Sequence, residues 1–212
     1  MSQGRDLLVD DFLDRHGFEV NRRESLGFYP SSHWHQGLEL VIVHTGEAEY
    51  HCDKGCEVVS AGEVHFRNGE LPHAPKVVSD RFERTVLHFK PELATYAPGR
   101  SILQRVYQYG MGFTTRPSEE SIERLLWVAE QLEAMIEHPA PRMTVEALIG
   151  VAITELETSK ADPQRPDVLD AVIDYMATNL ATDKTVDAVA KRFGISPRML
   201  FRWFKEYIGC TP

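Results

Sequence analysis

Four side chains in the N-terminal half have the types and the spacing of ligands for a divalent transition metal. His33 and His35 are separated by one residue, Glu39 follows them, and His73 lies further along the chain. In an unbroken strand, His33, His35 and Glu39 would share one face, because alternate residues do so. His73, from a later strand, would complete the set. Three imidazoles and one carboxylate suit Mn, Fe, Ni or Zn, and the coordination geometry chooses among these metals.

The remaining histidines have no such neighbours in the sequence. We therefore expect them to be surface residues or hydrogen-bonded core residues: His16, His44, His51, His65, His88 and His138. Cys52 and Cys56 flank a short polar segment that is typical of a hairpin loop. A disulfide between them and two free thiols are both open, and a reducing compartment favours the thiols.

A second chemical pattern, near the C-terminal end of the sequence, predicts two short helices joined by a tight turn. Thr185 and Ser196 are good N-caps, because their hydroxyls can accept from the free N–H groups of a first helical turn. Gly194 can take the left-handed conformation that ends a helix. Pro197 suits the first position of the second helix. This arrangement is typical of a helix-turn-helix, whose second helix lies in the major groove of DNA.

The second of these helices has one apolar and one basic face. Leu200 and Phe204 are spaced to point inward. The opposite face carries the side chains that are candidates for DNA contact: Arg198, Phe201, Arg202 and Lys205. Arginine can bond two atoms of a guanine, whereas a lysine more often contacts phosphate. An ordinary helical hairpin with a solvated basic face is the alternative interpretation.

The stretch from about Val168 to Pro212 resembles the first helix-turn-helix of the AraC family of bacterial transcription regulators. Its most specific part is Ile-Ser-Pro-Arg-x-Leu-x-Arg-x-Phe-Lys, followed by Gly-Cys-Thr-Pro. The resemblance implies that Arg198, Phe201 and Arg202 read bases, although a polar residue is often found where Phe201 stands. Family members carry two such motifs joined by a long helix, which would begin near residues 211–212. We therefore expect the DNA-binding unit to be incomplete within this sequence.

The histidine pattern resembles the cupin superfamily. Gly27 and Gly46 extend it to Gly-x5-His-x-His-x3-Glu-x6-Gly, which matches the first cupin motif closely. The second motif is looser: Gly62 and His73 have the right separation, but Asn68 stands where proline is usual. Cupin domains are the usual N-terminal half of AraC-type regulators, so the two resemblances support each other. In such regulators the barrel more often binds an organic effector, so His33, His35, Glu39 and His73 are expected either to line an effector pocket or to hold a metal.

The order of these patterns predicts an α+β fold, in which a cupin β-barrel or jelly roll is followed by helices and then by an all-α helix-turn-helix subdomain. The expected domains are a barrel with a short N-terminal helix (1–92), a helical extension (93–160), a linker (161–166) and the helix-turn-helix (167–212). Short runs rich in Val, Ile, Phe and Tyr predict the strands Phe18–Arg22, Leu38–Thr45, Ala48–Cys52, Cys56–Val59, Val64–Phe66, Lys76–Val78 and Arg84–Phe89. Helical periodicity predicts helices over Arg5–Arg15, Ile102–Tyr109, Ser118–Glu137, Thr144–Thr158 and Val168–Leu180. The apolar stripe from Ile122 to Ile136 is nearly heptad, so it predicts either packing on the barrel or a homodimer seam.

Composition excludes some classes of function. The 212-residue chain carries a net charge of −9. The segment from Ala188 onwards nevertheless contains five Lys and Arg residues and a single acidic residue, Glu206. A local basic patch is what phosphate contact requires. No apolar run approaches the roughly 20 residues of a membrane helix. The acidic N-terminus does not resemble a signal peptide, so we expect a cytoplasmic location and no membrane partner.

The sequence therefore predicts a sequence-specific DNA-binding regulator whose cupin domain senses a small molecule, with sugars as one class that the family suggests. Its partners would be operator DNA, the effector, a second copy of the chain, and RNA polymerase if it activates transcription. No cofactor is expected to be required, and a barrel with a divalent metal (Mn, Fe, Ni or Zn) and a barrel without one are both open. The alternative is a metal-dependent cupin enzyme of the dioxygenase or isomerase type, in which a capped basic helix has no evident use.

Overall fold

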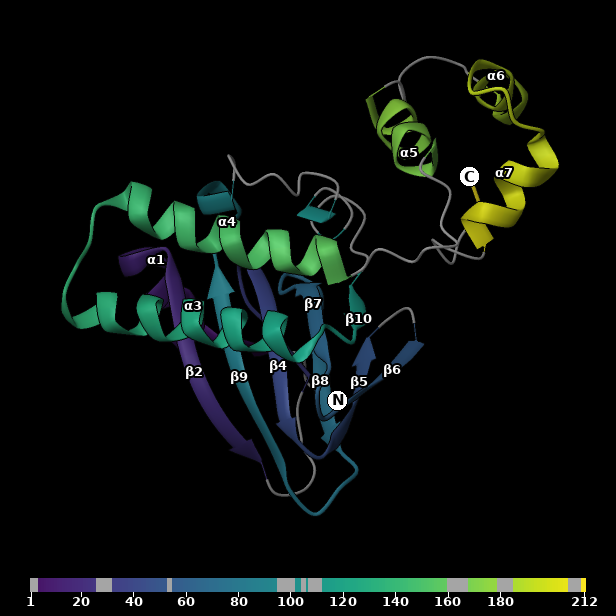
Figure 1. Ribbon diagram of the computed structural model, residues 1–212. Coiled ribbons are helices and arrows are strands. Elements are labelled where there is room, and N and C mark those ends of the chain that lie inside the picture. Colours follow the sequence, from purple (N-terminus) through teal and green to yellow (C-terminus); the bar gives the residue numbers. More distant parts are fainter. Residues whose placement is uncertain are drawn as a thin grey trace. The chain divides into compact units, whose positions relative to one another are not determined.

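Short strands with alternating apolar side chains form two five-stranded sheets in the first of two units (Figure 1). The computed structural model describes residues 4–25, 32–52, 55–94, 102–103, 106, 112–159, 168–178, 185–205 and 211–212. The chain divides into units Met1–Lys160 and Ala161–Pro212. None of the helices in these described ranges is both long and apolar enough to cross a membrane.

The first sheet (sheet A) has the order β1-β3-β8-β5-β6, and the second (sheet B) has the order β10-β7-β4-β9-β2. The strands are β1 (Gly4–Arg5), β2 (Phe18–Ser25), β3 (His33–Trp34), β4 (Leu38–Thr45), β5 (Glu47–Cys52), β6 (Gly55–Ser60), β7 (Val64–Asn68), β8 (His73–Val77), β9 (Phe82–Phe89) and β10 (Phe113–Thr115). All pairs are antiparallel except β1 with β3. The helices of this unit are α1 (Leu7–His16), the short η1 (Pro91–Ala94), α3 (Glu119–Glu137) and α4 (Arg142–Ser159). This is the predicted α+β arrangement of antiparallel sheets followed by helices.

The central strand β4 is buried on both of its faces. Leu38, Leu40 and Ile42 belong to the apolar cluster that also contains α3 and α4. Val41 and Val43 belong to a second cluster, together with side chains of sheet A. Because β4 lies between a helical layer and another sheet, it has a continuous buried run instead of a clean alternation.

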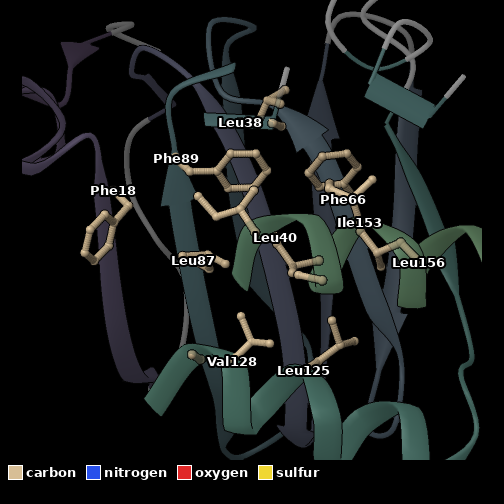
Figure 2. Close-up of a cluster of buried hydrophobic side chains, with 14 of the residues drawn as sticks. Phe18, Leu38, Leu40, Phe66, Leu87, Phe89, Leu125, Val128, Ile153 and Leu156 are labelled. Atoms are coloured by element: carbon tan, nitrogen blue, oxygen red, sulfur yellow. The ribbon is translucent and has the colours of Figure 1, made fainter. Parts of the chain in front are cut away.

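Two helices cover the outer face of sheet B. Figure 2 shows Leu125 and Val128 of α3 and Ile153 of α4 directed toward Phe66 and Phe89 of the sheet. Burial of each such side chain contributes about 1.5–3 kcal/mol. The stripe from Ile122 to Ile136 therefore packs within the chain, which is one of its two predicted roles.

The structure corrects the predicted strands at several points. It adds β1, β3 and β10, which are too short to show a periodicity of two residues. Strand β8 begins at His73, whereas the prediction began at Lys76. Most of the predicted helix Ile102–Tyr109, the linker 161–166, the loop 53–54 and Cys210 lie outside the described residues. In the β5–β6 hairpin, Cys52 is paired with Gly55 and Cys56 with His51.

The second unit consists of α5 (Val168–Thr178), α6 (Val186–Arg192) and α7 (Pro197–Trp203) in its described part. Thr185 caps α6 by accepting from the N–H of Ala188, and Ser196 caps α7 by accepting from the N–H of Met199. Gly194 has φ +66°, the left-handed turn that the sequence predicted. The core between the helices includes Leu169, Val172, Val189, Ala190, Leu200, Trp203 and Phe204.

Candidate functional site

The chain crosses from one sheet to the other within the histidine motif. His33 lies in β3 of sheet A, His35 lies in the connection, and Glu39 lies in β4 of sheet B. The three residues therefore do not share one face of a single unbroken strand. The break is at Gly37, whose φ of +84° is costly for any other residue. A Cβ at Gly37 would lie 2.6 Å from the backbone oxygen of Phe89, so the position has no space for a side chain.

Helix α1 holds this connection in place. The N–H of Gln36 donates to Oδ1 of Asp10 at 2.7 Å, and the Gln36 side chain donates to Oδ1 of Asp14 at 2.9 Å. Asp10 is buried and also pairs with Arg5. The buried carboxylate of Asp10 holds Gln36, the residue next to His35, in place. Breaking this hydrogen bond would leave the Asp10 carboxylate unsatisfied, which is costly.

Three imidazoles converge on one carboxylate oxygen. Oε2 of Glu39 lies 3.0 Å from Nε2 of His35, 3.4 Å from Nε2 of His73 and 3.3 Å from Nε2 of His88. His33 is paired with His73 across β3 and β8, with ring centroids 4.4 Å apart. The structure thus brings together all four residues that the sequence singled out, and it adds His88. We call these five residues the histidine cluster.

The second nitrogen of each converging ring is held by an oxygen acceptor. Nδ1 of His35 lies 3.1 Å from the carbonyl oxygen of Gln36, and Nδ1 of His73 lies 2.8 Å from that of Leu71. A carbonyl oxygen can only accept, so a neutral ring carries its proton on Nδ1 and leaves a lone pair on Nε2. That lone pair then faces the Glu39 carboxylate. His73 is 2 % exposed, and its Nε2 has no hydrogen-bond partner of good geometry among the described residues. A cation at the centre of the cluster would satisfy these facing acceptors.

The cluster belongs to a row of charged residues across sheet B. Glu19, His88, Glu39 and Arg67 are in register on the adjacent strands β2, β9, β4 and β7. Nε of Arg67 lies 3.1 Å from Oε1 of Glu39, and its guanidinium carbon lies 3.9 Å from the ring centre of Tyr50. Arg67 therefore engages one oxygen of Glu39, and the other oxygen faces the imidazoles.

His88 is a hydrogen-bonded core residue, one of the two roles expected for it, but the sequence did not indicate that it would lie beside Glu39. Its Nδ1 lies 2.8 Å from Oε2 of Glu19, and its Nε2 faces Glu39. No sequence motif contains His88. The only signal would have been the pairing register of β4, β9 and β2, which depends on the tertiary fold.

Charge and burial set the protonation of the cluster. Burial and the neighbouring His73 lower the pKa of His33 to about 4, so its ring is neutral near pH 7. Burial and then Arg67 lower the pKa of His73. Burial opposes the charge of Glu39, but Arg67 and His73 outweigh it and hold the pKa of this carboxyl well below its usual range. Burial also opposes the charged form of His88, yet its bonds to Glu19 and Glu39 raise its pKa.

The donor set fits a divalent transition metal. Two groups have ligand atoms within 4.8 Å of one another, His33 with His35 and His73, and His35 with Glu39 and His88. Both groups contain His35. Neutral imidazoles and a carboxylate are the ligands that Zn, Fe, Ni and Cu accept.

Gly69 has a direct role beside these ligands. A Cβ at this position would lie 2.1 Å from Cε1 of His35, so the His35 ring occupies the space of a side chain. The backbone oxygen of Gly69 also accepts from the N–H of His35 at 3.0 Å. This contact explains why a glycine stands at position 69.

His65 provides a prediction about pH, because it is fully buried in β7 outside the cluster. It is stacked on Tyr50 with ring centroids 5.3 Å apart, and its Nδ1 lies 3.0 Å from Oγ1 of Thr114. Burial and then Arg67 hold its pKa well below 6.5. Below pH 6.5 the unfolded chain binds a proton at this residue that the folded chain does not. The free energy of unfolding therefore decreases as the pH is lowered, by about 1.4 kcal/mol per pH unit.

We expect His65→Gln to remove that slope. Urea unfolding at about pH 7, 6 and 5 measures the slope for each chain. The matched control is His138→Gln, because His138 is exposed at the end of α3. An unchanged pH dependence in His65→Gln would contradict the prediction.

The candidate DNA-contacting residues lie together on the surface of α7 and its continuation. Arg198, Phe201, Arg202 and Lys205 are exposed, with Phe201 46 % exposed, while Leu200 is buried beneath them. Contact with DNA stays a prediction.

Comparison with known proteins gives a family match over most of the first unit. Residues 17–149 match the model of the AraC-like ligand binding domain. No curated protein sequence matches significantly. The AraC-like transcriptional activator CuxR is 14 % identical, with a TM-score of 0.42 over 90 % of this chain and 71 % of CuxR. ToxT from Vibrio cholerae is 8 % identical, with a TM-score of 0.44 over 89 % of this chain and 74 % of ToxT. A cupin 2 conserved barrel protein from Leptotrichia buccalis is 23 % identical, with a TM-score of 0.33 over 35 % of this chain and 36 % of that protein.

The family match covers more than half of the chain and includes every strand of sheet B, helix α3, the first part of α4, and the whole histidine cluster. The chain belongs to the family of AraC-like ligand-binding domains.

Proposed function

We propose that this protein is a transcription regulator that binds a small molecule at the histidine cluster and operator DNA through α6 and α7. The observation that carries the proposal is the presence, in one chain, of a ligand-binding domain of this family and a capped helix pair with an exposed basic face. Binding of the small molecule would shift the population toward or away from the form that binds DNA, provided that it prefers one of them.

The second helix of the pair is the element that would enter the major groove. Arg198, Phe201 and Arg202 would contact base edges, and Lys205 would contact phosphate. A thymine methyl group is a suitable partner for the exposed ring of Phe201. A homodimer would present two such helices to two half-sites, and an activator would also contact RNA polymerase.

The histidine cluster would be the ligand site. Its Nε2 atoms, the Glu39 carboxylate and the buried Arg67 offer hydrogen bonds and charge to an oxygen-rich small molecule such as a sugar. A divalent transition metal held by His33, His35, Glu39 and His73 would polarise an oxygen of such a ligand. The histidine cluster also supports the second candidate, a metal-dependent cupin enzyme, because the Nε2 atoms of His35, His73 and His88 face one carboxylate oxygen of Glu39.

Replacing Arg202 by alanine tests the regulator proposal. Binding sites would first be selected from a random DNA duplex library with the full chain. We expect Arg202→Ala to relax the preference at one base position by about 1–3 kcal/mol, because one bidentate base contact is lost. Lys205→Ala should weaken binding to all sequences alike and reduce the salt dependence.

The control variant is Arg142→Ala, which removes an exposed arginine of α4 whose Nε lies 2.7 Å from Oε1 of Glu146. Its DNA affinity should equal that of the unaltered chain. If the library yields no preferred site, or if Arg202→Ala retains the full preference, α7 does not read DNA. Turnover of a substrate by the metal-loaded chain would instead favour the enzyme.

A further inference from the structure

We propose that His88 and Glu19, which lie outside both cupin motifs, complete a metal site in the histidine cluster, with His88 as a ligand through Nε2 and Glu19 as its positioning residue. This inference depends on the metal-binding part of the proposed function. It enlarges the set His33, His35, Glu39 and His73 by one imidazole and gives that imidazole a carboxylate support.

The position of His88 makes it an inward-pointing donor. It lies in β9, between β2 and β4, and is 1 % exposed. Its ring centroid lies 4.6 Å from that of His35, and the two rings are inclined by 76°. Nε2 of His88 lies 3.3 Å from the same oxygen of Glu39 that faces His35 and His73. The three Nε2 atoms therefore approach one point from different strands and from the β3–β4 connection, as ligands around an ion do.

Glu19 sets the tautomer of His88. Its Oε2 lies 2.8 Å from Nδ1 of His88, and the residue is buried in the edge strand β2. An ionised carboxylate accepts a hydrogen bond from Nδ1–H, which keeps the proton on Nδ1, leaves Nε2 free to bind a metal, and makes the imidazole a stronger donor. Carbonyl oxygens have the same role for His35 and His73. Of the three rings that converge on Glu39, His88 is the one whose Nδ1 is supported by a carboxylate, and this negative charge further favours a cation at the centre.

The alternative role for His88 is that of an imidazolium that bridges Glu19 and Glu39. Both arrangements place positive charge between two buried carboxylates. They differ in what lies on Nε2, which is a metal ion in the first case and a proton in the second. The difference can be measured directly.

Nitrogen-15 NMR of the histidine side chains in the unaltered full chain is the first measurement. Addition of one equivalent of Zn²⁺ should shift the Nε2 resonance of His88 toward the range of metal-bound imidazole, together with that of His35. An unshifted His88 Nε2 resonance beside a shifted His35 resonance would overturn the inference. This measurement needs no variant that might fold poorly.

The second measurement is the affinity for Zn²⁺, obtained by competition with a chromophoric chelator. We expect Glu19→Gln to lower the affinity by about 10–100-fold, the range for loss of a carboxylate behind a ligating histidine, and His88→Asn to lower it further. Electron paramagnetic resonance of the Cu²⁺-loaded chain should lose one nitrogen coupling in His88→Asn. A purely structural role would not change that count.

His65→Asn is the matched control, because His65 is also a buried histidine of sheet B with a side-chain partner but lies outside the cluster. Its Zn²⁺ affinity and its Cu²⁺ spectrum should remain those of the unaltered chain. Equal affinity and equal nitrogen count in His88→Asn would overturn the inference while the cupin-type site stands. If the unaltered chain binds neither ion, the inference fails with the whole metal site, whereas DNA binding is tested separately.

Discussion

Replacing His35 by alanine is expected to lower the affinity of the chain for Zn²⁺ by more than about 100-fold, because even the loss of a supporting group behind a ligand costs 10–100-fold. His35 belongs to both groups of candidate ligands, so its loss leaves neither complete. Its ring is fully buried, and its Nε2 makes the shortest approach to Glu39, at 3.0 Å. Isothermal titration or chelator competition would measure the change.

The control for this variant is His44→Ala. His44 lies in β4 near Glu39 in sequence, but its Nε2 bonds to Oγ1 of Thr85 at 2.8 Å, away from the cluster. Zn²⁺ affinity should be unaffected by its removal. Equal affinities for His35→Ala and the unaltered chain would show that the cluster does not hold the metal, and the cluster would then have to bind an organic effector directly.

Replacing Gly37 by alanine is the second change with a large expected effect, this time on stability. The left-handed conformation with φ +84° costs roughly 1–2 kcal/mol for a residue with a Cβ. The added methyl group would also lie 2.6 Å from the backbone oxygen of Phe89 and 3.3 Å from Cδ1 of Leu13. Because the backbone of β9 is fixed by pairing on both sides, we expect a total loss of about 3–5 kcal/mol in the free energy of unfolding.

Gly150→Ala is the matched control. Gly150 lies inside α4, and a Cβ there would meet no atom within 4 Å. Alanine should stabilise this helix by about 0.5–1 kcal/mol, because glycine loses more backbone entropy on folding. Urea unfolding of both variants measures the contrast. If Gly37→Ala is as stable as the unaltered chain, the tight connection between β3 and β4 does not require glycine.

Gly37 also links stability to the site. The residue separates His35, which is attached to sheet A through β3, from Glu39 in sheet B. A shift of this turn would change the distance between these two candidate ligands. We therefore expect any folded Gly37→Ala protein to bind Zn²⁺ less tightly as well.

Local signals were sufficient for the capped helix pair α6 and α7 and for most of the sheets. The caps at Thr185 and Ser196 and the turn at Gly194 depend on a few neighbouring residues, and the structure has them as predicted. Strand β4 was predicted with its observed bounds, because a long apolar run between polar turns is a strong signal. Strands of two or three residues, such as β3, carry no such signal.

The amino-acid sequence by itself determined which residues form the motif, His33, His35, Glu39 and His73, and that they would meet. It did not determine how they meet. The break at Gly37 leaves His33 in sheet A and Glu39 in sheet B, and the pairing of β9 with β2 and β4 places His88 between Glu19 and Glu39. Pairing register is a long-range property, because it depends on how distant strands align and pack. Only the tertiary structure could therefore decide that a fourth imidazole belongs to the site.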